Sequence, residues 1–215
     1  KRKDIITVAI DSPAAAGAGT QAKLIAKHYN LLYLDTGKIY RFVGLLRLKK
    51  KKEFNYTFVE KKISKLKMQD LQDKKLLTES VAISASVISK NKRIRNIVHK
   101  FQQKCAYSPP LKFDGSVLDG RDIITVQMKD ANFKFFITAS TKTRAKRRFN
   151  EYKNLNKKIT YKEVLRNIRK RDKSDKERPK KLGKLYKTKD SILINTTKLS
   201  KKACFRKIKA IMDRK

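Results

Sequence analysis

The sequence predicts an α/β fold in which a central parallel sheet of about five strands is flanked by helices. Short apolar, β-branched runs alternate with longer helical patterns, which is the order of parallel strands joined by crossover helices. The first such run, residues 5–10, is followed at once by a turn of small residues and a helix, as in loops that bind phosphate. The chain has 215 residues, of which 40% are hydrophobic, so we expect one domain with a packed core.

Five segments are expected to form the strands. Each is short, rich in Val, Ile, Leu or Phe, and bounded by turn residues or charges. They are residues 5–10, 31–34, 116–119, 133–138 and 191–196. We expect Asn30 to end the helix before the second strand, and Asp35, Thr36 and Gly37 to form a turn after it.

Helical patterns fill most of the remaining chain. The expected helices are residues 21–29, 38–48, 92–98, 141–152, 160–171 and 200–212. Thr160 and Glu163 make a capping box, and Ser200 caps the last helix. Residues 53–77 have a weak, polar pattern that predicts an insertion outside the main core. The lysine run at 49–52 is expected to be solvated, and the charged residues 172–189 are expected to form a mobile loop.

The loop after the first strand departs from the usual phosphate-loop pattern. That pattern reads G-x-x-x-x-G-K-[ST]. Here Ser12 stands at the first glycine, Gly17 at the second, and Ala18 at the lysine, and Gly19 and Thr20 follow. These residues fit either a phosphate loop or an ordinary strand-to-helix connection.

The chain is strongly basic, with 57 Lys and Arg against 19 Asp and Glu and a formal net charge of +38. This charge fits a nucleic-acid binder or an enzyme with a lysine-rich surface. The lysines are spread through the whole chain, which favours the enzyme. The only cysteines, Cys105 and Cys204, lie far apart, and the only histidines are His28 and His99. Two cysteines cannot form a disulfide framework or a zinc site by themselves, and two histidines argue against a histidine-based triad or metal cluster.

The first residues lead directly into the first strand, and no apolar run is long enough to span a bilayer. We therefore expect no cleaved leader and no membrane segment. A reducing cytoplasm is the expected location, and we expect a monomer.

Four further segments carry a family resemblance. They read LDTGKIYR at 34–41, AS at 85–86 with RIR at 93–95, DGRDIITV at 119–126, and RDKSDKER at 171–178. In order and spacing they resemble bacterial cytidylate (CMP) kinase, a nucleoside monophosphate kinase with a phosphate loop. The resemblance implies a three-layer P-loop kinase fold over a single domain, residues 1–215. It also implies an acceptor-nucleotide-binding insertion at residues 41–92 and a lid at residues 171–189.

The resemblance further implies an activity and its residues. Such enzymes transfer the γ-phosphoryl group of ATP to CMP or dCMP, giving CDP or dCDP in pyrimidine nucleotide metabolism. The Mg²⁺ ion arrives with ATP, and no direct ligation by the protein is expected. The implied ATP-binding residues are Ser12, Pro13, Ala14, Ala15, Ala16, Gly17, Ala18, Gly19 and Thr20. The implied CMP-binding residues are Asp11, Thr36, Tyr40, Arg41, Ser86, Arg95, Arg121, Asp122 and Asp175. The implied catalytic residues are Arg121, Asp122, Arg171 and Arg178.

Each of these residues also has a plainer interpretation. Arg41, Arg95 and Arg121 fit surface arginines in a basic chain. Asp11 and Asp122 fit helix or turn caps, and Asp175 fits a partner of neighbouring lysines. The arginines at 144, 147 and 148 are interpreted as a solvated helix side rather than a site.

Three positions depart from the family pattern. Ala18 replaces a lysine that would follow charge onto the transferred group, so we expect an intact fold with impaired catalysis. Lys23 is a poor substitute because it is rotated about 140° around the helix from position 18. Ser12 and Ile124 each stand where the family has glycine. Two alternatives stay open: a basic nucleic-acid-binding protein without catalysis on the same fold, and a kinase of another nucleoside monophosphate such as UMP or AMP.

Overall fold

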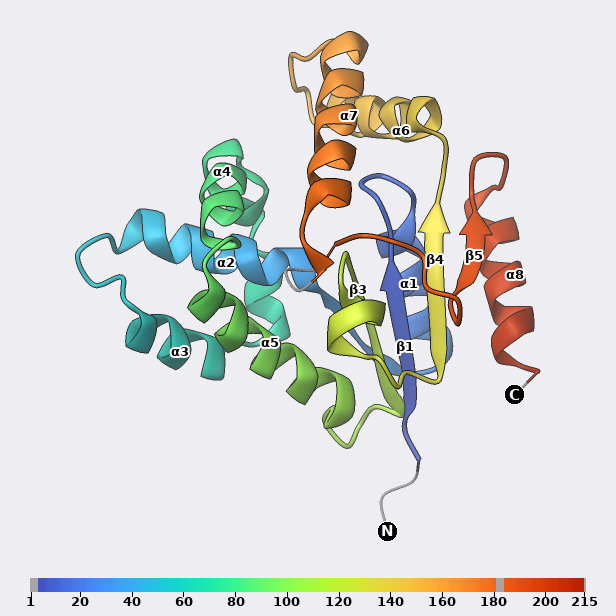
Figure 1. Cartoon of the computed structure of the whole chain (residues 1–215), viewed down its shortest axis with the longest axis horizontal. Helices are drawn as coiled ribbons and strands as arrows, with labels where there is room; N and C mark the ends of the chain where they lie inside the picture. Colours follow the sequence, from blue (N-terminus) through green and yellow to red (C-terminus); the bar gives the residue numbers. More distant parts are fainter. Residues whose placement is uncertain (1–3, 181–183, 215) are drawn as a thin grey trace. The chain divides into compact units, whose positions relative to one another are not determined.

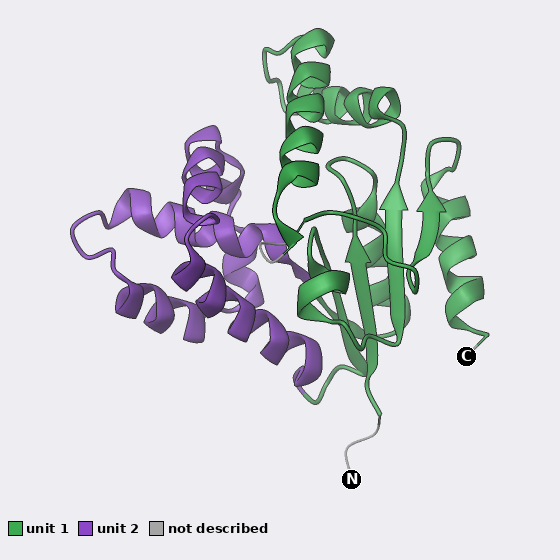
Figure 2. Cartoon of the chain, in the orientation of Figure 1, with its two compact units in different colours: residues 1–33, 111–215 green, residues 34–110 purple. Residues whose placement is uncertain are grey.

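A computed structural model describes residues 4–180 and 184–214 of the chain. The chain forms two compact units (Figure 2). The first comprises residues 1–33 and 111–215, and the second comprises residues 34–110.

A five-stranded sheet with the strand order β2-β3-β1-β4-β5 organises the first unit. The pairings of β1 with β3, of β1 with β4, and of β4 with β5 are parallel. The strands are β1 (Ile6–Asp11), β2 (Leu31–Asp35), β3 (Gly115–Gly120), β4 (Phe133–Thr138) and β5 (Ile192–Asn195). The predicted α/β fold with a five-stranded parallel sheet flanked by helices is therefore confirmed, and each strand lies within one residue of its predicted range.

The central strand β1 is paired along both of its edges. Val8 pairs with Val117 of β3 and with Phe133 of β4. The main core of this unit packs these strands against α1 (Ala18–His28) and α8 (Lys201–Met212), through side chains such as Ile25 and Ile208. Ser200 caps α8 by accepting the Ala203 N–H at 3.1 Å, as predicted.

Two helices, α6 (Thr141–Asn154) and α7 (Tyr161–Glu177), follow the carboxyl end of β4 (Figure 1). The predicted capping box at the start of α7 is present, with Thr160 and Glu163 bonded reciprocally. The expectation that a loop begins at residue 172 is wrong, because α7 continues to Glu177. Asp172 and Asp175 both accept hydrogen bonds from arginines, and these contacts stabilise the charged last turns.

The second unit is helical. It contains α2 (Thr36–Lys49), α3 (Tyr56–Ser64), two short 3₁₀ turns η1 (Met68–Gln72) and η2 (Lys74–Leu77), α4 (Glu79–Ile88) and α5 (Lys92–Tyr107). The expected turn at 35–37 is wrong, because Asp35 accepts the Lys38 N–H and caps α2. At Gly44, α2 approaches α4 closely, since an added Cβ would lie 2.9 Å from the Ala85 nitrogen.

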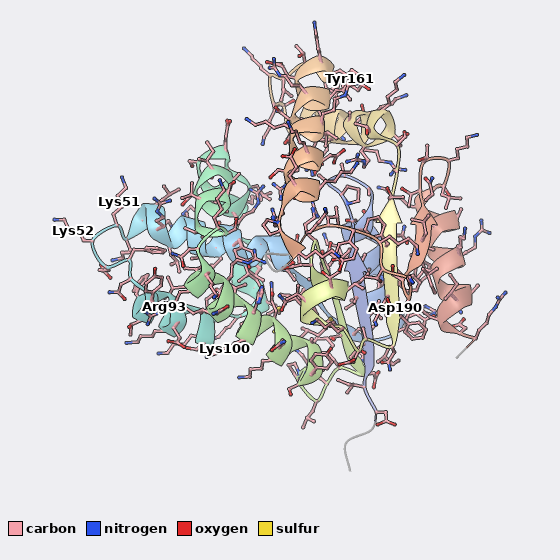
Figure 3. The ribbon with its side chains drawn as sticks, viewed as in Figure 1. Lys51, Lys52, Arg93, Lys100, Tyr161 and Asp190 are labelled. Carbon is pink, nitrogen blue, oxygen red and sulfur yellow. The ribbon has the colours of Figure 1, made fainter. Side chains whose placement is uncertain are left out.

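The structure also bears on the expectations about the lysine run, the cysteines and membrane segments. Lys51 and Lys52 are exposed and point outward after α2, as expected for a solvated run (Figure 3). Cys105 and Cys204 are buried free thiols. Across residues 4–180 and 184–214, none of the helices combines the length and the apolar character needed to cross a membrane.

Candidate functional site

The loop between β1 and α1 has the backbone shape of an anion-binding turn. Ala15 and Gly17 have positive φ angles of 60° and 98°. The Ser12 N–H donates to the Gly120 carbonyl at 3.1 Å and fixes the start of the loop beside β3. Gly17 precedes α1, and the first turn of that helix carries no acidic residue. The positive end of the helix dipole therefore faces the loop without a competing carboxylate from that turn.

Ala15 stores backbone strain at this loop. A left-handed conformation costs an L-residue about 1–2 kcal/mol, and glycine adopts it without this cost. Part of the stability gained by relieving this strain is lost again, because glycine adds conformational entropy to the unfolded chain. We expect Ala15→Gly to raise the free energy of unfolding by about 0.5–1 kcal/mol, measured by urea denaturation. An unchanged or lower stability would show that the loop relaxes to a negative φ in solution.

Ala18 follows Gly17 and occupies the position where the phosphate-loop pattern has lysine. It is the first residue of α1, its side chain is 3% exposed, and it packs with Ala22 and Ile25 in the core of the first unit. An alanine methyl offers no charge to an anion. Lys23 is exposed on the same helix.

Asp11, at the end of β1, has the contacts of a turn cap. Its carboxylate accepts the Ile123 N–H at 2.8 Å and the Ile124 N–H at 3.1 Å, and its side chain is fully buried. These two bonds hold η3 (Ile123–Gln127), a single π-helical turn, against the end of β1. Burial raises the pKa of Asp11 to about 7, and the two N–H groups oppose that shift. These contacts are those of the capping interpretation; the contact of Asp11 with the acceptor nucleotide stays a prediction.

The raised pKa of Asp11 predicts a pH-dependent stability. Between its ordinary value of 3.8 and about 7, the folded chain keeps a proton that the unfolded chain releases. The free energy of unfolding therefore falls as the pH rises through this window. Relative to Asp11→Asn, we expect the wild-type chain to lose about 2–4 kcal/mol between pH 4 and pH 8, measured by urea denaturation. Parallel pH profiles for the two proteins would contradict this expectation.

Three of the predicted arginines gather around one buried carboxylate. Asp175 of α7 is 0% exposed, and its Oδ2 lies 2.9 Å from Arg121 Nε. Its Oδ1 lies 3.5 Å from both Arg171 Nε and Arg178 Nη2. Arg121 follows β3, whereas Arg171 and Arg178 lie one turn before and one turn after Asp175. Asp175 is thus an arginine partner, and the interpretation that it pairs with lysines is wrong. We call Arg121, Arg171, Arg178 and Asp175 the arginine cluster.

Two further carboxylates lie at the carboxyl end of β3. Asp122 stands at the start of η3, where its carbonyl accepts the Val126 N–H and its charge helps to raise the pKa of Asp11. Asp119 lies beside the start of α1, because its Oδ2 would be 3.6 Å from a Cβ added to Gly19. Sequence reasoning assigned no role to Asp119. The sequence signal for such a role was its place at the carboxyl end of a predicted strand, where ligands bind in open α/β sheets.

The interpretation of 144, 147 and 148 as a solvated helix side is wrong for the first two arginines. Arg144 is 4% exposed and donates to the Ala14 carbonyl of the loop at 3.2 Å. Arg147 donates to the Ala16 carbonyl at 3.3 Å. Arg148 is more exposed and pairs with Glu151 one turn away. A spacing of three residues on a helix was visible in the sequence, but so many basic residues surround it that burial could not be inferred.

The second unit brings together some of the predicted acceptor-binding residues. The Arg95 guanidinium lies 5.9 Å from the centre of the Tyr40 ring, and its Nη1 donates to the Ser89 carbonyl at 3.3 Å. Arg95 is buried and belongs to α5. Arg41, next to Tyr40 on α2, donates to the Leu76 carbonyl at 2.8 Å.

Thr36 and Ser86 have different surroundings within this unit. Thr36 is buried as the first residue of α2, whereas Ser86 is exposed on α4. Ser84, two residues earlier, is buried and donates to the Gly44 carbonyl at 3.1 Å. Of these two α4 hydroxyls, Ser84 therefore bonds the neighbouring helix, whereas Ser86 is exposed.

Comparison with known proteins gives a consistent result. The family model described as "Cytidylate kinase" matches residues 8–214. A protein named cytidylate kinase from Thermosipho melanesiensis is 38% identical over 218 residues, covering 97% of each chain. One of the same name from Clostridium perfringens is 35% identical over 227 residues, covering 98% of this chain and 99% of the other. A crystal structure of an uncharacterized protein from Eubacterium ventriosum matches with a TM-score of 0.57 at 18% identity, over 99% of this chain and 100% of the other. That likeness shows the fold alone.

Proposed function

Because the chain belongs to the cytidylate kinase family, we propose that it transfers the γ-phosphoryl group of ATP to CMP or dCMP, giving CDP or dCDP. The observation that supports this most strongly within the chain itself is the arginine cluster. Three guanidinium groups lie within 3.5 Å of one buried carboxylate. A concentration of fixed positive charge of this kind is what a transferring phosphoryl group requires.

The chemistry needs positioning more than covalent assistance. In phosphoryl transfer the attacking and leaving oxygens lie roughly in line, and charge spreads over the three equatorial oxygens. Arg121, Arg171 and Arg178 are suited to hold these oxygens because a guanidinium fork binds two of them and keeps its charge. We propose that Asp175 holds these forks in place before the nucleotides arrive and contacts the acceptor sugar afterwards.

We propose that the second unit holds the acceptor nucleotide. Tyr40, Arg41 and Arg95 would contact its phosphate, and the exposed hydroxyl of Ser86 would bond the cytosine, which offers an amino donor beside acceptors. The contact of Arg95 with Tyr40 supports this grouping. Thr36 is buried, so we propose that it supports the start of α2 next to the acceptor.

We propose that the loop at residues 12–20 binds the ATP phosphates through its N–H groups. A divalent cation bound to ATP would neutralise phosphate charge when present. The described residues contain no group of three or more His, Cys, Asp or Glu side chains able to hold a metal. Mg²⁺ is commonly bound by one or two carboxylates together with substrate phosphates. The sequence-based expectation is no direct ligation by the protein; we propose instead that Asp119, beside the start of α1, supplies a single carboxylate.

We also propose functional boundaries and a setting for the chain. Residues 41–92, within the second unit, would form the acceptor-binding insertion. Residues 171–189 would form the lid, and part of it, residues 181–183, lies outside the described residues. Both substrates are water-soluble nucleotides, and we propose that the chain acts on them as a monomer in the cytoplasm.

The experiment is a coupled phosphoryl-transfer assay with ATP, Mg²⁺ and a panel of acceptors. We expect CDP or dCDP to form from CMP or dCMP, with little product from UMP or AMP. Faster phosphorylation of UMP or AMP would assign the chain to another acceptor. No product from any acceptor, together with strongly salt-dependent RNA binding, would favour the nucleic-acid-binding alternative that the +38 charge suggests.

A further inference from the structure

The guanidinium group of Arg144 has a hydrogen-bond acceptor for each of its five N–H donors. Its Nε donates to the Ala139 carbonyl at 3.0 Å, and its Nη1 donates to the Ala14 carbonyl at 3.2 Å. The two Nη groups also donate to the Asp172 carboxylate, with Nη1–Oδ1 at 2.9 Å and Nη2–Oδ2 at 2.6 Å. Nη2 further donates to Thr141 Oγ1 at 3.3 Å. Arg144 therefore joins the loop after β1 to helix α7 through a single rigid group.

Arg144 therefore connects two segments that we propose to bind phosphate. Ala14 belongs to the proposed ATP phosphate loop. Asp172 lies three residues before Asp175 on α7, so the two carboxylates lie on neighbouring turns of one helix face. Asp175 in turn carries the arginine cluster. A displacement of α7 would thus also displace the loop, because Asp172 and Arg144 connect the two.

Two other contacts tie the loop to α6 and α7. Arg147 donates both to the Ala16 carbonyl and to the Thr196 hydroxyl. The Thr196 hydroxyl in turn donates to the Ala16 carbonyl at 2.8 Å. The side chains of Ala14 and Ala15 pack against an apolar cluster of Ala145, Val164 and Ile168 from the two helices. The carbonyls of Ala14 and Ala16 are therefore held by two arginines of α6. These bonds use loop carbonyls, so they do not compete with an anion for the loop N–H groups.

We propose that Arg144 is a positioning residue that fixes the phosphate loop and the lid helix α7 relative to each other. The loop N–H groups and the arginine cluster then act as one preorganised phosphate site. This inference rests on the proposed function for its consequence, and on the contacts of the first unit for its geometry. Rigid placement matters because a misplacement of about 1 Å can reduce the rate about 10²-fold.

The test is hydrogen exchange, in ligand-free protein, at the Gln21 N–H, which donates to the Gly17 carbonyl of the loop at 3.1 Å and which we call loop exchange. Asp172→Asn, on α7, is expected to speed loop exchange about tenfold, because the Arg144 fork loses its charged partner. If that variant does not fold, Arg144→Lys is used, since it keeps the buried charge and loses the fork. The matched control is Arg148→Gln on the same helix, which is expected to leave loop exchange unchanged. Faster exchange confined to α7, with the loop unchanged, would overturn the proposal.

Calorimetric titration with MgATP supplies the second readout. We expect the folded variant to bind ATP about tenfold more weakly than the wild type, and Arg148→Gln to bind it equally. If the wild type binds no ATP but Asp172→Asn still speeds loop exchange, the coupling stands and the proposed function fails. If the wild type binds ATP and the variant changes neither loop exchange nor affinity, the coupling fails and the proposed function stands.

Discussion

Ala18→Lys is expected to raise kcat for CMP phosphorylation by about 10²–10³-fold. A lysine at this position would place a charge at the start of α1, where the loop now presents a buried methyl group. Preorganised charge aimed at the developing negative charge of a transition state is commonly the largest single contribution to catalysis. Under our proposal, the wild-type chain relies instead on the loop N–H groups and on the arginine cluster. The measurement is a coupled assay of CMP and ATP at saturating concentrations of both.

Lys23→Ala is the matched control for this prediction. Lys23 is the next lysine on α1 and is exposed, so its removal is expected to leave kcat unchanged. If Ala18→Lys folds but kcat does not rise, the assignment of residues 12–20 as the ATP phosphate loop is wrong. A large loss in Lys23→Ala would instead show that Lys23 already supplies the missing charge.

Arg121→Gln is expected to lower kcat by about 10²–10³-fold. Arg121 reaches the buried Asp175 from the end of β3 at 2.9 Å, so glutamine removes a fixed charge and releases one oxygen of the carboxylate that holds Arg171 and Arg178. The assay is best made in the Ala18→Lys background, where the starting rate is higher. Arg121→Lys restores the charge without the planar fork and is expected to recover only part of the rate.

Arg148→Gln is the control for Arg121, because it removes an arginine whose observed partner is Glu151 on the same helix. Thermal unfolding of each variant establishes that a lost rate is not lost folding. Equal rates for Arg121→Gln and Arg148→Gln, with both proteins folded, would remove the arginine cluster from the mechanism.

The inner strands of the sheet were predictable from sequence because they are buried on both faces and therefore read as continuous apolar runs. The edge strand β5 also came from an apolar run, although only Ile194 of its four residues is buried. All five strands came from such runs, and the caps at Thr160 and Ser200 came from short-range side-chain patterns. The end of α7 was not predictable in this way. Its last turns are stabilised by Arg121, which follows β3, and by Arg144 of α6, both of which are far away in the sequence. Local propensity contains no information about such partners.

The candidate site shows the same limit. Arg121, Arg171 and Arg178 followed from the family resemblance, and the structure places them around Asp175. Arg144 and Arg147 resembled the other basic residues of a chain with 57 Lys and Arg. Their bonds to the loop carbonyls distinguish them from solvated arginines, and these bonds depend on how α6 packs against the loop. Asp11 was similarly ambiguous, because a carboxylate after a strand fits either a ligand or a cap.

The most direct test of the account is titration of the wild-type chain with CMP, followed by thermal unfolding. Binding to the folded state raises stability even where catalysis is slow, so Ala18 does not confound the result. We expect a saturable rise in Tm with CMP that exceeds the rise with UMP or AMP and that is reduced in Arg41→Gln and Arg95→Gln. No saturable rise with CMP, in a protein whose unfolding is cooperative, would contradict the account.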